Sequence, residues 1–590
     1  MRPVRNLRFT PILIFICTCI IFLVLLSKMS QESIKTEQVL KEQLEYLREK
    51  NRDLEDAIKR KEAMLEMVIN QRKNDNIKVI SNRNTENLSL DLNHGINYAT
   101  KKNDTANQKT ESTRAPTLDY ELTRRRLRRD INEFWLYLKG IIDKSLKEKS
   151  GNISNLFQQA LLDGQHRHST LHVILSELAN HDGFQDWRET EHKELSDLMQ
   201  KRLHSLQNPR NCSKARYSLC RINKGCGLGC ELHHVVYCFI VSYATERTLI
   251  LDSRKWNYKQ YKAGGAFEDI FKPLSDTCVI DLNDPKAIVI TSWPGKQDSR
   301  IVEIPFIDRM KPHPDFLPPS IPEDLAPRLV RLHGNPIVWW IGQFFKYLLR
   351  PQEDTLKLYK EAEKERDLSK PMVGVHIRRT DKIIKEAKFH GIEEYMAHVE
   401  AYFQQLEVKQ SGTAISPKQV FIASDDPKVF TECRKKYPDY TFLGDESRAK
   451  SASMTSRFNF NSLKKTMVDI YMLSRSDYIV CTLSSNLGRL AYEIQQQRYP
   501  DGSWRLRSLD DIWYFAGGDN QHEVILPHTT NNSEEVDLEL GDILNSLGNH
   551  WDGYSKGTIK ERDALGMYPL YKTKPKVKVA KFPTYSHVKL

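Results

Sequence analysis

The chain has 590 residues, more than a single hydrophobic core can organise, so we expect two or three domains joined by linkers. Its 89 lysines and arginines outnumber its 77 aspartates and glutamates, which gives a net charge of +12 at pH 7. This modest excess suits a phosphate-bearing or otherwise acidic substrate. No nucleic-acid-binding motif accompanies it, so nucleic acid is excluded as the expected partner.

The N-terminus has the features of a membrane anchor. An apolar run from Pro11 to Leu26 follows three arginines. A signal peptide is the alternative, but no small-x-small cleavage site follows the run, which favours an uncleaved span. The arginines predict a cytoplasmic tail over 1–9, a transmembrane signal anchor over 10–28 and a lumenal remainder. A span this short fits the thinner early-secretory membranes, so we predict a single-pass type II protein of the Golgi membrane.

Helical patterns follow the anchor. Apolar residues at heptad spacing predict a coiled-coil stem over 29–73, and Asn51 at a core position favours a homodimer through the stem helices. Residues 74–116 are rich in Asn, Thr and Lys without periodicity, which predicts a flexible linker. Apolar residues at helical spacing predict a helical region over 117–207. We expect it to form a hairpin that packs on the following domain or on a second copy of the chain.

Six cysteines lie close together in the sequence, which predicts a disulfide framework in an oxidising compartment. These residues are Cys212, Cys220, Cys226, Cys230, Cys238 and Cys278. Six cysteines allow fifteen pairings, and the sequence leaves all of them open. Zinc near Cys226, Cys230, His233 and His234 is the alternative, which we disfavour because the C-x3-C spacing has no second pair.

Residues 208–515 alternate between short apolar runs and amphipathic segments. The runs predicted as strands are Thr248–Leu251, Ala287–Thr291, Met372–Val375, Val420–Ala423, Tyr440–Leu443 and Tyr478–Cys481. Strands that alternate with helices predict an α/β fold with a doubly wound, Rossmann-like parallel sheet. Ligands of such sheets bind beyond the carboxyl ends of the strands.

A cluster of charged residues follows the strand Met372–Val375 directly. It comprises His376, Arg378, Arg379, Asp381, Lys382 and Glu386. Arginine matches phosphate oxygens bidentately and lysine adds a point charge, so we expect a ligand that carries phosphate. Glu386 is the carboxylate of this loop that can act as a general base. A solvated charged loop is the alternative, which the preceding apolar strand disfavours.

A second candidate anion site is the glycine-rich loop NKGCGLGC, which contains Gly225 and Gly227 and opens onto an apolar helix. The N-terminus of a helix offers backbone N–H groups to an anion. The loop matches neither G-x-G-x-x-G nor the Walker A motif, and its cysteines are also consistent with a stapled tight turn.

The segment GVHIRRTDK, followed by EAKFHGIEEYM, resembles the signature of the eukaryotic α1,6-fucosyltransferases that add core fucose to N-glycans. Protein O-fucosyltransferases and bacterial nodulation fucosyltransferases share a looser H-x-R-x-x-D version. The resemblance implies a GT-B-related catalytic body that uses GDP-fucose as co-substrate, with no cofactor and no metal. It implies inverting transfer of fucose to the 6-hydroxyl of the innermost, asparagine-linked GlcNAc of an N-glycoprotein acceptor.

The resemblance also implies roles for individual residues. Glu386 is the base, Lys382 links it to the donor, and Arg378 stabilises charge on the departing pyrophosphate. The implied donor-binding residues are Gly225, Gly227, Tyr258, His376, Arg378, Arg379, Asp381, Asp469, Ser485 and Asn486. Asp469 suits this role chemically, because a lone carboxylate in an apolar helix needs a partner and guanine offers N–H donors. Without the resemblance, Tyr258 would be interpreted as a core aromatic residue.

The last segment, over 516–583, resembles an SH3-like β-barrel through its motifs ELGDIL, NHWDGYSKG and LGMYPLYKTK. Cytosolic SH3 domains bind proline-rich peptides, which we do not expect as ligands in a lumen. In the resembling family the barrel belongs to the acceptor site, which implies that Asp510, Asp511 and His550 bind the acceptor glycan. A helix cap or a turn is the alternative interpretation of the two aspartates.

The sequence departs from the vertebrate members of this family, which have glutamine at the position of Asn486 and cysteine at the position of Gly488. That cysteine pairs with the equivalent of Cys481 in those proteins. Here we expect Cys481 to be a buried free thiol or to pair with Cys433.

Paired aspartates at Asp425 and Asp426 resemble the metal ligands of many sugar-nucleotide enzymes. The sequence S-D-D-P also suits a helix N-cap, with proline in the first turn. We favour the cap and predict no metal.

Two other functions stay open at this point. A GDP-fucose enzyme that acts on protein hydroxyls would keep the donor residues but would have no use for the barrel. A lumenal lectin or scaffold would be expected to have lost part of the charged cluster, which is complete here. Both alternatives are therefore disfavoured.

Overall fold

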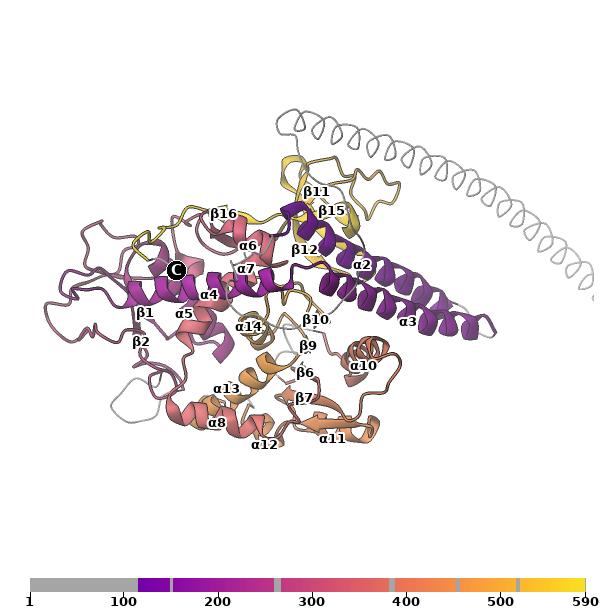
Figure 1. Cartoon of the computed structure of the whole chain (residues 1–590). Coiled ribbons are helices and arrows are strands. Elements are labelled where there is room, and N and C mark those ends of the chain that lie inside the picture. Colours follow the sequence, from indigo (N-terminus) through magenta and orange to yellow (C-terminus); the bar gives the residue numbers. More distant parts are fainter. Residues whose placement is uncertain are drawn as a thin grey trace, which may run out of the picture. The chain divides into compact units, whose positions relative to one another are not determined.

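The computed structural model describes residues 115–148, 152–258, 267–380, 388–452, 457–515 and 520–588 (Figure 1). The predicted cytoplasmic tail, membrane anchor, coiled-coil stem and the linker up to residue 114 lie outside these ranges. Among the helices within them, none is both long enough and apolar enough to cross a membrane.

Three helices precede the first strand: α2 (Leu118–Glu148), α3 (Asn152–His181) and α4 (Gln185–Gln207). α2 and α3 lie side by side (Figure 1). The Ser169 hydroxyl of α3 donates to Gln404 Oε1 of the body at 3.2 Å. Large hydrophobic side chains of this pair that stay exposed are Leu118, Leu122, Leu127, Phe134, Tyr137, Leu138, Ile141, Leu162, Leu171, Ile174 and Leu178. The hairpin thus packs on the body and also presents uncovered apolar surface.

The first sheet is parallel, with the strand order β2-β1-β4-β3. Its strands are β1 (Tyr217–Arg221), β2 (Thr248–Asp252), β3 (Val289–Ile290) and β4 (Ile301–Glu303). α5 (Leu228–Ala244) connects β1 to β2 and is buried on all sides from Leu232 to Tyr243, as its largely apolar sequence predicts. It packs on α7 (Pro336–Leu348), where the Phe239 and Phe344 rings meet edge to face at 5.4 Å.

The second sheet is also parallel, with the strand order β10-β9-β6-β7-β8. Its strands are β6 (Met372–Ile377), β7 (Lys418–Ser424), β8 (Tyr440–Leu443), β9 (Tyr478–Cys481) and β10 (Leu506–Ser508). Its helices are α10 (Ile392–Lys409), α11 (Lys428–Lys436), α13 (Phe460–Arg475) and α14 (Asn486–Gln495). Every residue of β6 is buried, as expected for a parallel strand covered on both faces. The two parallel sheets confirm the α/β prediction.

Shorter elements connect these layers. They are η1 (Ile307–Arg309), β5 (Ser320–Pro322), α6 (Ala326–Leu332), α8 (Glu353–Glu363) and α12 (Glu446–Ser451). α2 packs against α6, where Arg125 Nη1 donates to the carbonyl of Val330 at 2.8 Å. Arg125 Nε also lies 3.2 Å from Asp501 Oδ2, so a partly buried ion pair fixes the helical region to the α/β body.

The C-terminal segment forms a five-stranded antiparallel sheet with the order β14-β13-β12-β11-β15. Its elements are β11 (Asn520–Val524), β12 (Ile543–Asn549), β13 (Tyr554–Ile559), η2 (Lys560–Arg562), β14 (Ala564–Pro569), η3 (Leu570–Lys572) and β15 (Thr573–Pro575). The chain then returns to the body, where β16 (Lys578–Ala580) pairs with β5. The Tyr585 hydroxyl donates to the carbonyl of Tyr243 in α5 at 2.8 Å, which anchors this return in the core of the first sheet.

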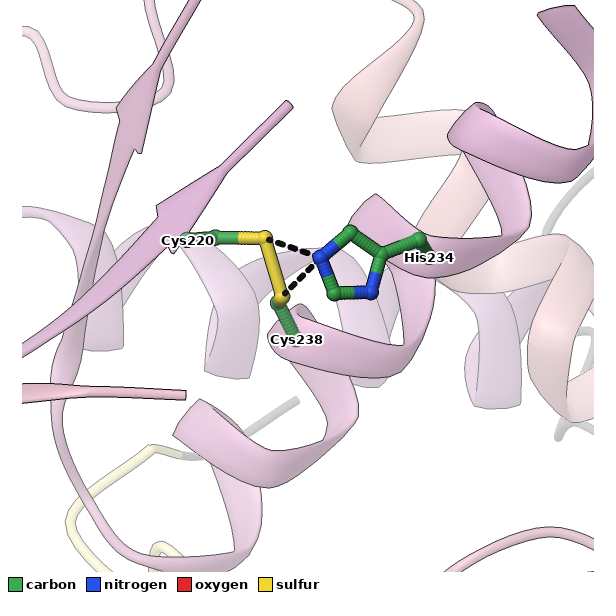
Figure 2. Close-up of side chains that lie close together, drawn as sticks. All are labelled: Cys220, His234 and Cys238. Atoms are coloured by element: carbon green, nitrogen blue, oxygen red, sulfur yellow. Dashed lines mark hydrogen bonds between the residues drawn. A yellow bond between two sulfur atoms is a disulfide. The ribbon is translucent and has the colours of Figure 1, made fainter. Parts of the chain in front are cut away.

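The six clustered cysteines form three disulfides, Cys212–Cys278, Cys220–Cys238 and Cys226–Cys230, so one of the fifteen pairings is now selected. Cys220 and Cys238 lie close enough to His234 to suggest a metal site. Figure 2 shows that their sulfurs are bonded to each other, with His234 Nε2 at 3.8 Å from each. The zinc alternative needed thiolates at Cys226 and Cys230. These two cysteines are also bonded to each other, so that alternative is wrong for this oxidised state.

Within the part of the chain that the structure describes, the two cysteines outside the cluster, Cys433 and Cys481, are buried free thiols. Cys481 follows the first of its two expected outcomes and does not pair with Cys433. Burial raises the pKa of the Cys433 thiol to about 12 and raises the pKa of Cys481 as well, which keeps both thiols protonated and unreactive.

Replacing both Cys212 and Cys278 by serine should destabilise the fold more than replacing both Cys226 and Cys230. The first disulfide closes a loop of 66 residues and the second a loop of 4. Chain entropy alone then predicts losses of about 4 and about 2 kcal/mol in the free energy of unfolding. Denaturant unfolding of the two double variants measures both values, and an equal or larger loss for the Cys226–Cys230 pair would contradict the prediction.

Candidate active site

The carboxyl edge of the second sheet brings the charged residues of several loops together. His376 is the buried penultimate residue of the central strand β6, and Arg378 and Arg379 follow the strand. Asp425 follows β7 and Asp510 follows β10. Because all five strands are parallel, these loops leave the sheet at the same edge, where ligands of α/β proteins bind.

Asp425 organises the loop that follows β6. Its carboxylate accepts hydrogen bonds from the backbone N–H groups of Arg379 at 2.8 Å and Thr380 at 3.1 Å. It also accepts from the Thr380 hydroxyl and pairs with Arg378 Nη1 at 2.5 Å. The helix-cap interpretation of Asp425 is therefore wrong. It applies in part to Asp426, whose Oδ1 accepts from the N–H of Lys428, the first residue of α11, at 3.0 Å.

The two adjacent arginines have different partners. Arg378 pairs with Asp425, whereas Arg379 Nη1 lies 2.9 Å from Glu432 Oε2 on α11. The Arg379 guanidinium also lies 5.0 Å from the centre of the Phe389 ring. The two adjacent guanidinium groups thus bind carboxylates on different elements of the described structure. Asp381, Lys382 and Glu386 lie outside the described residues, so the predicted base and its lysine stay predictions.

The glycine-rich loop leads directly into the N-terminus of α5. Gly225 has a φ of +73°, a conformation that favours glycine, and Gly227 is the residue before the helix. A Cβ at either glycine would have no heavy atom within 4 Å, so both positions face open space. The N–H of Leu228 donates to the hydroxyl of Tyr258 at 3.2 Å. Burial raises the pKa of Tyr258 to about 12, and the charges of Arg457 and Arg378 act against that rise.

The N-terminus of α14 meets the N-terminus of α5. A Cβ at Gly229 would lie 2.8 Å from Asn486 Cβ, so only glycine permits this approach. Ser485 is the buried residue before α14, and Asn486 Oδ1 accepts from Arg489 Nη2 at 2.6 Å. Each helix N-terminus carries unsatisfied N–H groups and a partial positive charge. Two of them side by side suit a ligand with more than one anionic group.

Asp469 lies on α13 and pairs with a buried arginine. Its Oδ1 is 2.8 Å from Nε of Arg448 on α12. Burial raises the pKa of Asp469 to about 7, although the charge of Arg448 opposes this rise. The carboxylate is therefore poised between its two protonation states near neutral pH.

The predicted acceptor residues lie where the antiparallel sheet meets the α/β body. Asp510 accepts from the N–H of Ser484 at 3.3 Å, from the Ser484 hydroxyl and from the N–H of Asp511 at 2.5 Å. The carbonyl of Asp510 accepts from Trp551 Nε1 at 3.1 Å. Burial raises the pKa of Asp511, and His550 is exposed. Both aspartates accept backbone N–H groups of their own turn, as their alternative interpretation predicted.

Comparison with known proteins identifies the family. A family model described as alpha-(1,6)-fucosyltransferase N- and catalytic domains matches residues 3–514. The chain belongs to this family. The alpha-(1,6)-fucosyltransferase of Drosophila melanogaster is 45% identical over 480 residues, which are 80% of this chain and 76% of the relative. That of Caenorhabditis elegans is 34% identical over 571 residues, which are 93% of this chain and 94% of the relative.

Solved structures give a more distant likeness. The fucosyltransferase NodZ from Bradyrhizobium is 15% identical and has a TM-score of 0.30, and the match covers 47% of this chain and 92% of that protein. The family model and the two relatives confirm the resemblance that the segment around Arg378 predicted.

Replacing Asp425 by alanine should release the loop after β6. A hydrogen bond to a charged carboxylate contributes about 1.5–3 kcal/mol, so the amides of Arg379 and Thr380 should exchange with solvent roughly 10- to 100-fold faster. Hydrogen–deuterium exchange of the peptide that spans β6 and this loop measures the change. Asp426→Ala is the matched control and should change this exchange much less, because Asp426 accepts no backbone N–H of the loop: it bonds to α11 and reaches the loop through the Arg379 side chain at 3.8 Å.

Proposed function

We propose that this alpha-(1,6)-fucosyltransferase family member transfers fucose from GDP-fucose to the 6-hydroxyl of the innermost, asparagine-linked GlcNAc of N-glycans. The observation that carries the proposal is the family match over residues 3–514. The two parallel sheets support a GT-B-related catalytic body, and the antiparallel C-terminal sheet supports an SH3-like barrel. The family match also favours this function over transfer to protein hydroxyls and over a lectin or scaffold.

The donor diphosphate would lie at the paired N-termini of α5 and α14, next to Arg378. The N–H group of Gly227 and the N–H groups of the first turn of α14, which follows Ser485, would bind its oxygens, and the Arg378 guanidinium would offset the charge that grows on GDP as it departs. Asp425 holds this guanidinium in place before the donor arrives. Such preorganised groups stabilise the transition state, and the loss of one typically costs about 2.7–4 kcal/mol of barrier.

The chemical step is one displacement. Glu386 would take the proton of the GlcNAc 6-hydroxyl, whose oxygen attacks the anomeric carbon of fucose while the bond from that carbon to the diphosphate oxygen breaks. The anomeric carbon is inverted and GDP leaves. Lys382 and Asp381 keep their proposed roles at the donor, and the electrostatic work assigned to Arg378 requires no metal ion.

The guanine base would be recognised by Asp469 together with His376. Guanine presents N1–H and an exocyclic amine, and an ionised carboxylate accepts both hydrogen bonds. The pairing with Arg448 supports this role, because it orients the carboxylate and favours its ionised form.

The acceptor glycan would bind where the barrel meets the body. The contact between Trp551 and Asp510 brings the loop that carries His550 beside the turn that precedes α14. This arrangement supports a joint acceptor site of Asp510, Asp511 and His550. In this arrangement the barrel has a role in binding the acceptor glycan, whereas a transferase for protein hydroxyls would have no use for the barrel.

The chain would act in the Golgi lumen, attached to the membrane by the predicted anchor over 10–28. The three disulfides suit an oxidising lumen. The predicted stem lies outside the described residues, but the exposed apolar side chains of α2 and α3 support a homodimer that covers them.

The test uses a secreted fragment from about residue 110, with GDP-fucose, EDTA and a GlcNAc-terminated biantennary glycopeptide. Mass spectrometry with linkage analysis should find one deoxyhexose 1,6-linked to the reducing-end GlcNAc. Arg378→Ala should lower kcat about 10²- to 10³-fold. Arg434→Ala should stay within about twofold of the wild type, because Arg434 is an exposed arginine paired with Glu446 outside the site.

Three outcomes of this test would contradict the account. Binding of GDP-fucose without transfer would indicate a different acceptor, and no binding at all would favour a scaffold. An Arg378→Ala enzyme with a raised donor KM and a normal kcat would refute the role of Arg378 in the transition state.

Donor affinity should fall as the pH drops through 7. The pKa of Asp469 is raised to about 7 in the free protein, so its carboxylate becomes protonated as the pH falls below 7. The protonated carboxyl group then places an O–H donor opposite the N1–H donor of guanine, and the hydrogen bond between them is lost. We expect the Kd of GDP-fucose to be roughly tenfold higher at pH 6 than at pH 8. Isothermal titration without acceptor measures it, since the diphosphate of GDP-fucose does not titrate in this range.

Asp469→Asn is the control for this pH dependence. The variant should bind GDP-fucose weakly and with the same Kd at pH 6 and pH 8. A flat profile for the wild-type protein, or an unchanged slope in the variant, would remove Asp469 from base recognition.

A further inference from the structure

A buried bridge joins the two helices whose N-termini form the candidate donor site. His233 lies on α5 and Glu493 on α14, and His233 Nε2 is 2.9 Å from Glu493 Oε2. His233 Nδ1 lies 2.6 Å from the carbonyl oxygen of Gly229, and Trp513 Nε1 donates to Glu493 Oε1 at 2.9 Å. The side chain of Glu493 is fully buried, and the rings of Phe345 and Phe515 flank His233 at 5.6 and 5.7 Å.

The hydrogen-bond partners determine where the protons lie. A carbonyl oxygen only accepts, so His233 Nδ1 must donate to Gly229. The indole N–H of Trp513 only donates, so Glu493 Oε1 must accept. One proton then occupies the contact between His233 Nε2 and Glu493 Oε2. No polar atom of the bridge is left unsatisfied, which is the condition under which a buried charged pair is tolerated.

The bridge ends at the point where the two helices touch. Gly229, whose carbonyl accepts from His233, is the residue that packs directly against Asn486 at the start of α14. α5 belongs to the first sheet and α14 to the second, so this bridge also links the two halves of the α/β body. Glu493 lies in the last turn of α14, so the bridge and the contact between Gly229 and Asn486 connect the two helices at separate points along α14.

We propose that His233 and Glu493 are positioning residues for the donor, which hold the N-termini of α5 and α14 at the spacing that one diphosphate spans. The inference rests on the proposed function, because it assumes that these N-termini bind GDP-fucose. Neither residue touches the reacting atoms in this account. Their effect should therefore appear in donor binding rather than in the rate of the chemical step.

Two substitutions of Glu493 separate positioning from charge. Glu493→Gln keeps the geometry, because its amide oxygen accepts from Trp513 and its NH₂ donates to a neutral His233. Glu493→Met has a similar length but makes neither bond. We expect the donor KM to rise at least tenfold in Glu493→Met and less than threefold in Glu493→Gln. In both variants kcat and the acceptor KM should stay within about twofold of the wild type.

His333→Ala is the matched control. His333 is a buried histidine that contacts the same end of α14 as Glu493 does, with Nε2 2.9 Å from Oε1 of Gln496, the residue that follows the helix. Its removal should lower thermal stability without changing the donor KM. His233→Gln completes a double-mutant cycle with Glu493→Met. Each substitution should raise the donor KM, and the free-energy changes that correspond to these increases should be clearly less than additive, because both substitutions break the same bridge.

The outcomes discriminate between the bridge and the function on which it rests. If Glu493→Met lowers thermal stability as His333→Ala does but leaves the donor KM unchanged, the bridge is structural only and the proposal fails. If Glu493→Met does not fold, His233→Gln alone gives the same decision, because its amide reaches Glu493 but cannot also reach Gly229. A wild-type protein that binds no GDP-fucose would overturn the proposed function and the positioning role together.

Discussion

The close approach of two helix N-termini is the constraint on which the rest of the site depends. α5 leaves the first sheet and α14 leaves the second, and they touch at Gly229, where a Cβ would lie 2.8 Å from Asn486. The like ends of two helix dipoles repel each other, so this arrangement needs fixed supports and favours an anion between them. The supports are present: α7 packs its Gly342 on the backbone of α14, and the His233–Glu493 bridge joins the two helices.

Ion pairs and hydrogen bonds also hold the loops on either side of the two helix N-termini. Asp425 accepts hydrogen bonds from the loop after β6 and pairs with Arg378. Asp510 accepts from the N–H of Ser484 in the turn before α14, and its carbonyl accepts from Trp551 in the C-terminal segment. The residues that we propose for donor and acceptor binding are thus held by neighbours on other elements. A site supported in this way can present its charges before the substrate arrives, which is how electrostatic preorganisation lowers a barrier.

Short apolar runs made four of the five strands of the second sheet predictable, whereas β10, with the sequence LRS, has no such run and was missed. The charged cluster after β6 indicated the edge of the sheet at which we place the site. The pairing of the cysteines was not predictable, because it depends on α5 packing against β1, which places Cys238 beside Cys220. Asp425 was misassigned because S-D-D-P is also a good helix start, and its true partners come from the neighbouring strand β6. The His233–Glu493 bridge joins residues 260 positions apart, beyond the reach of local patterns.

The most direct test of this account is a crystal structure of the lumenal fragment with GDP. The account predicts diphosphate oxygens within hydrogen-bonding distance of the N-termini of both α5 and α14 and of Arg378, with the guanine base on Asp469. A diphosphate bound at only one of the two helices, or a base remote from Asp469, would contradict the claim that their junction is the donor site.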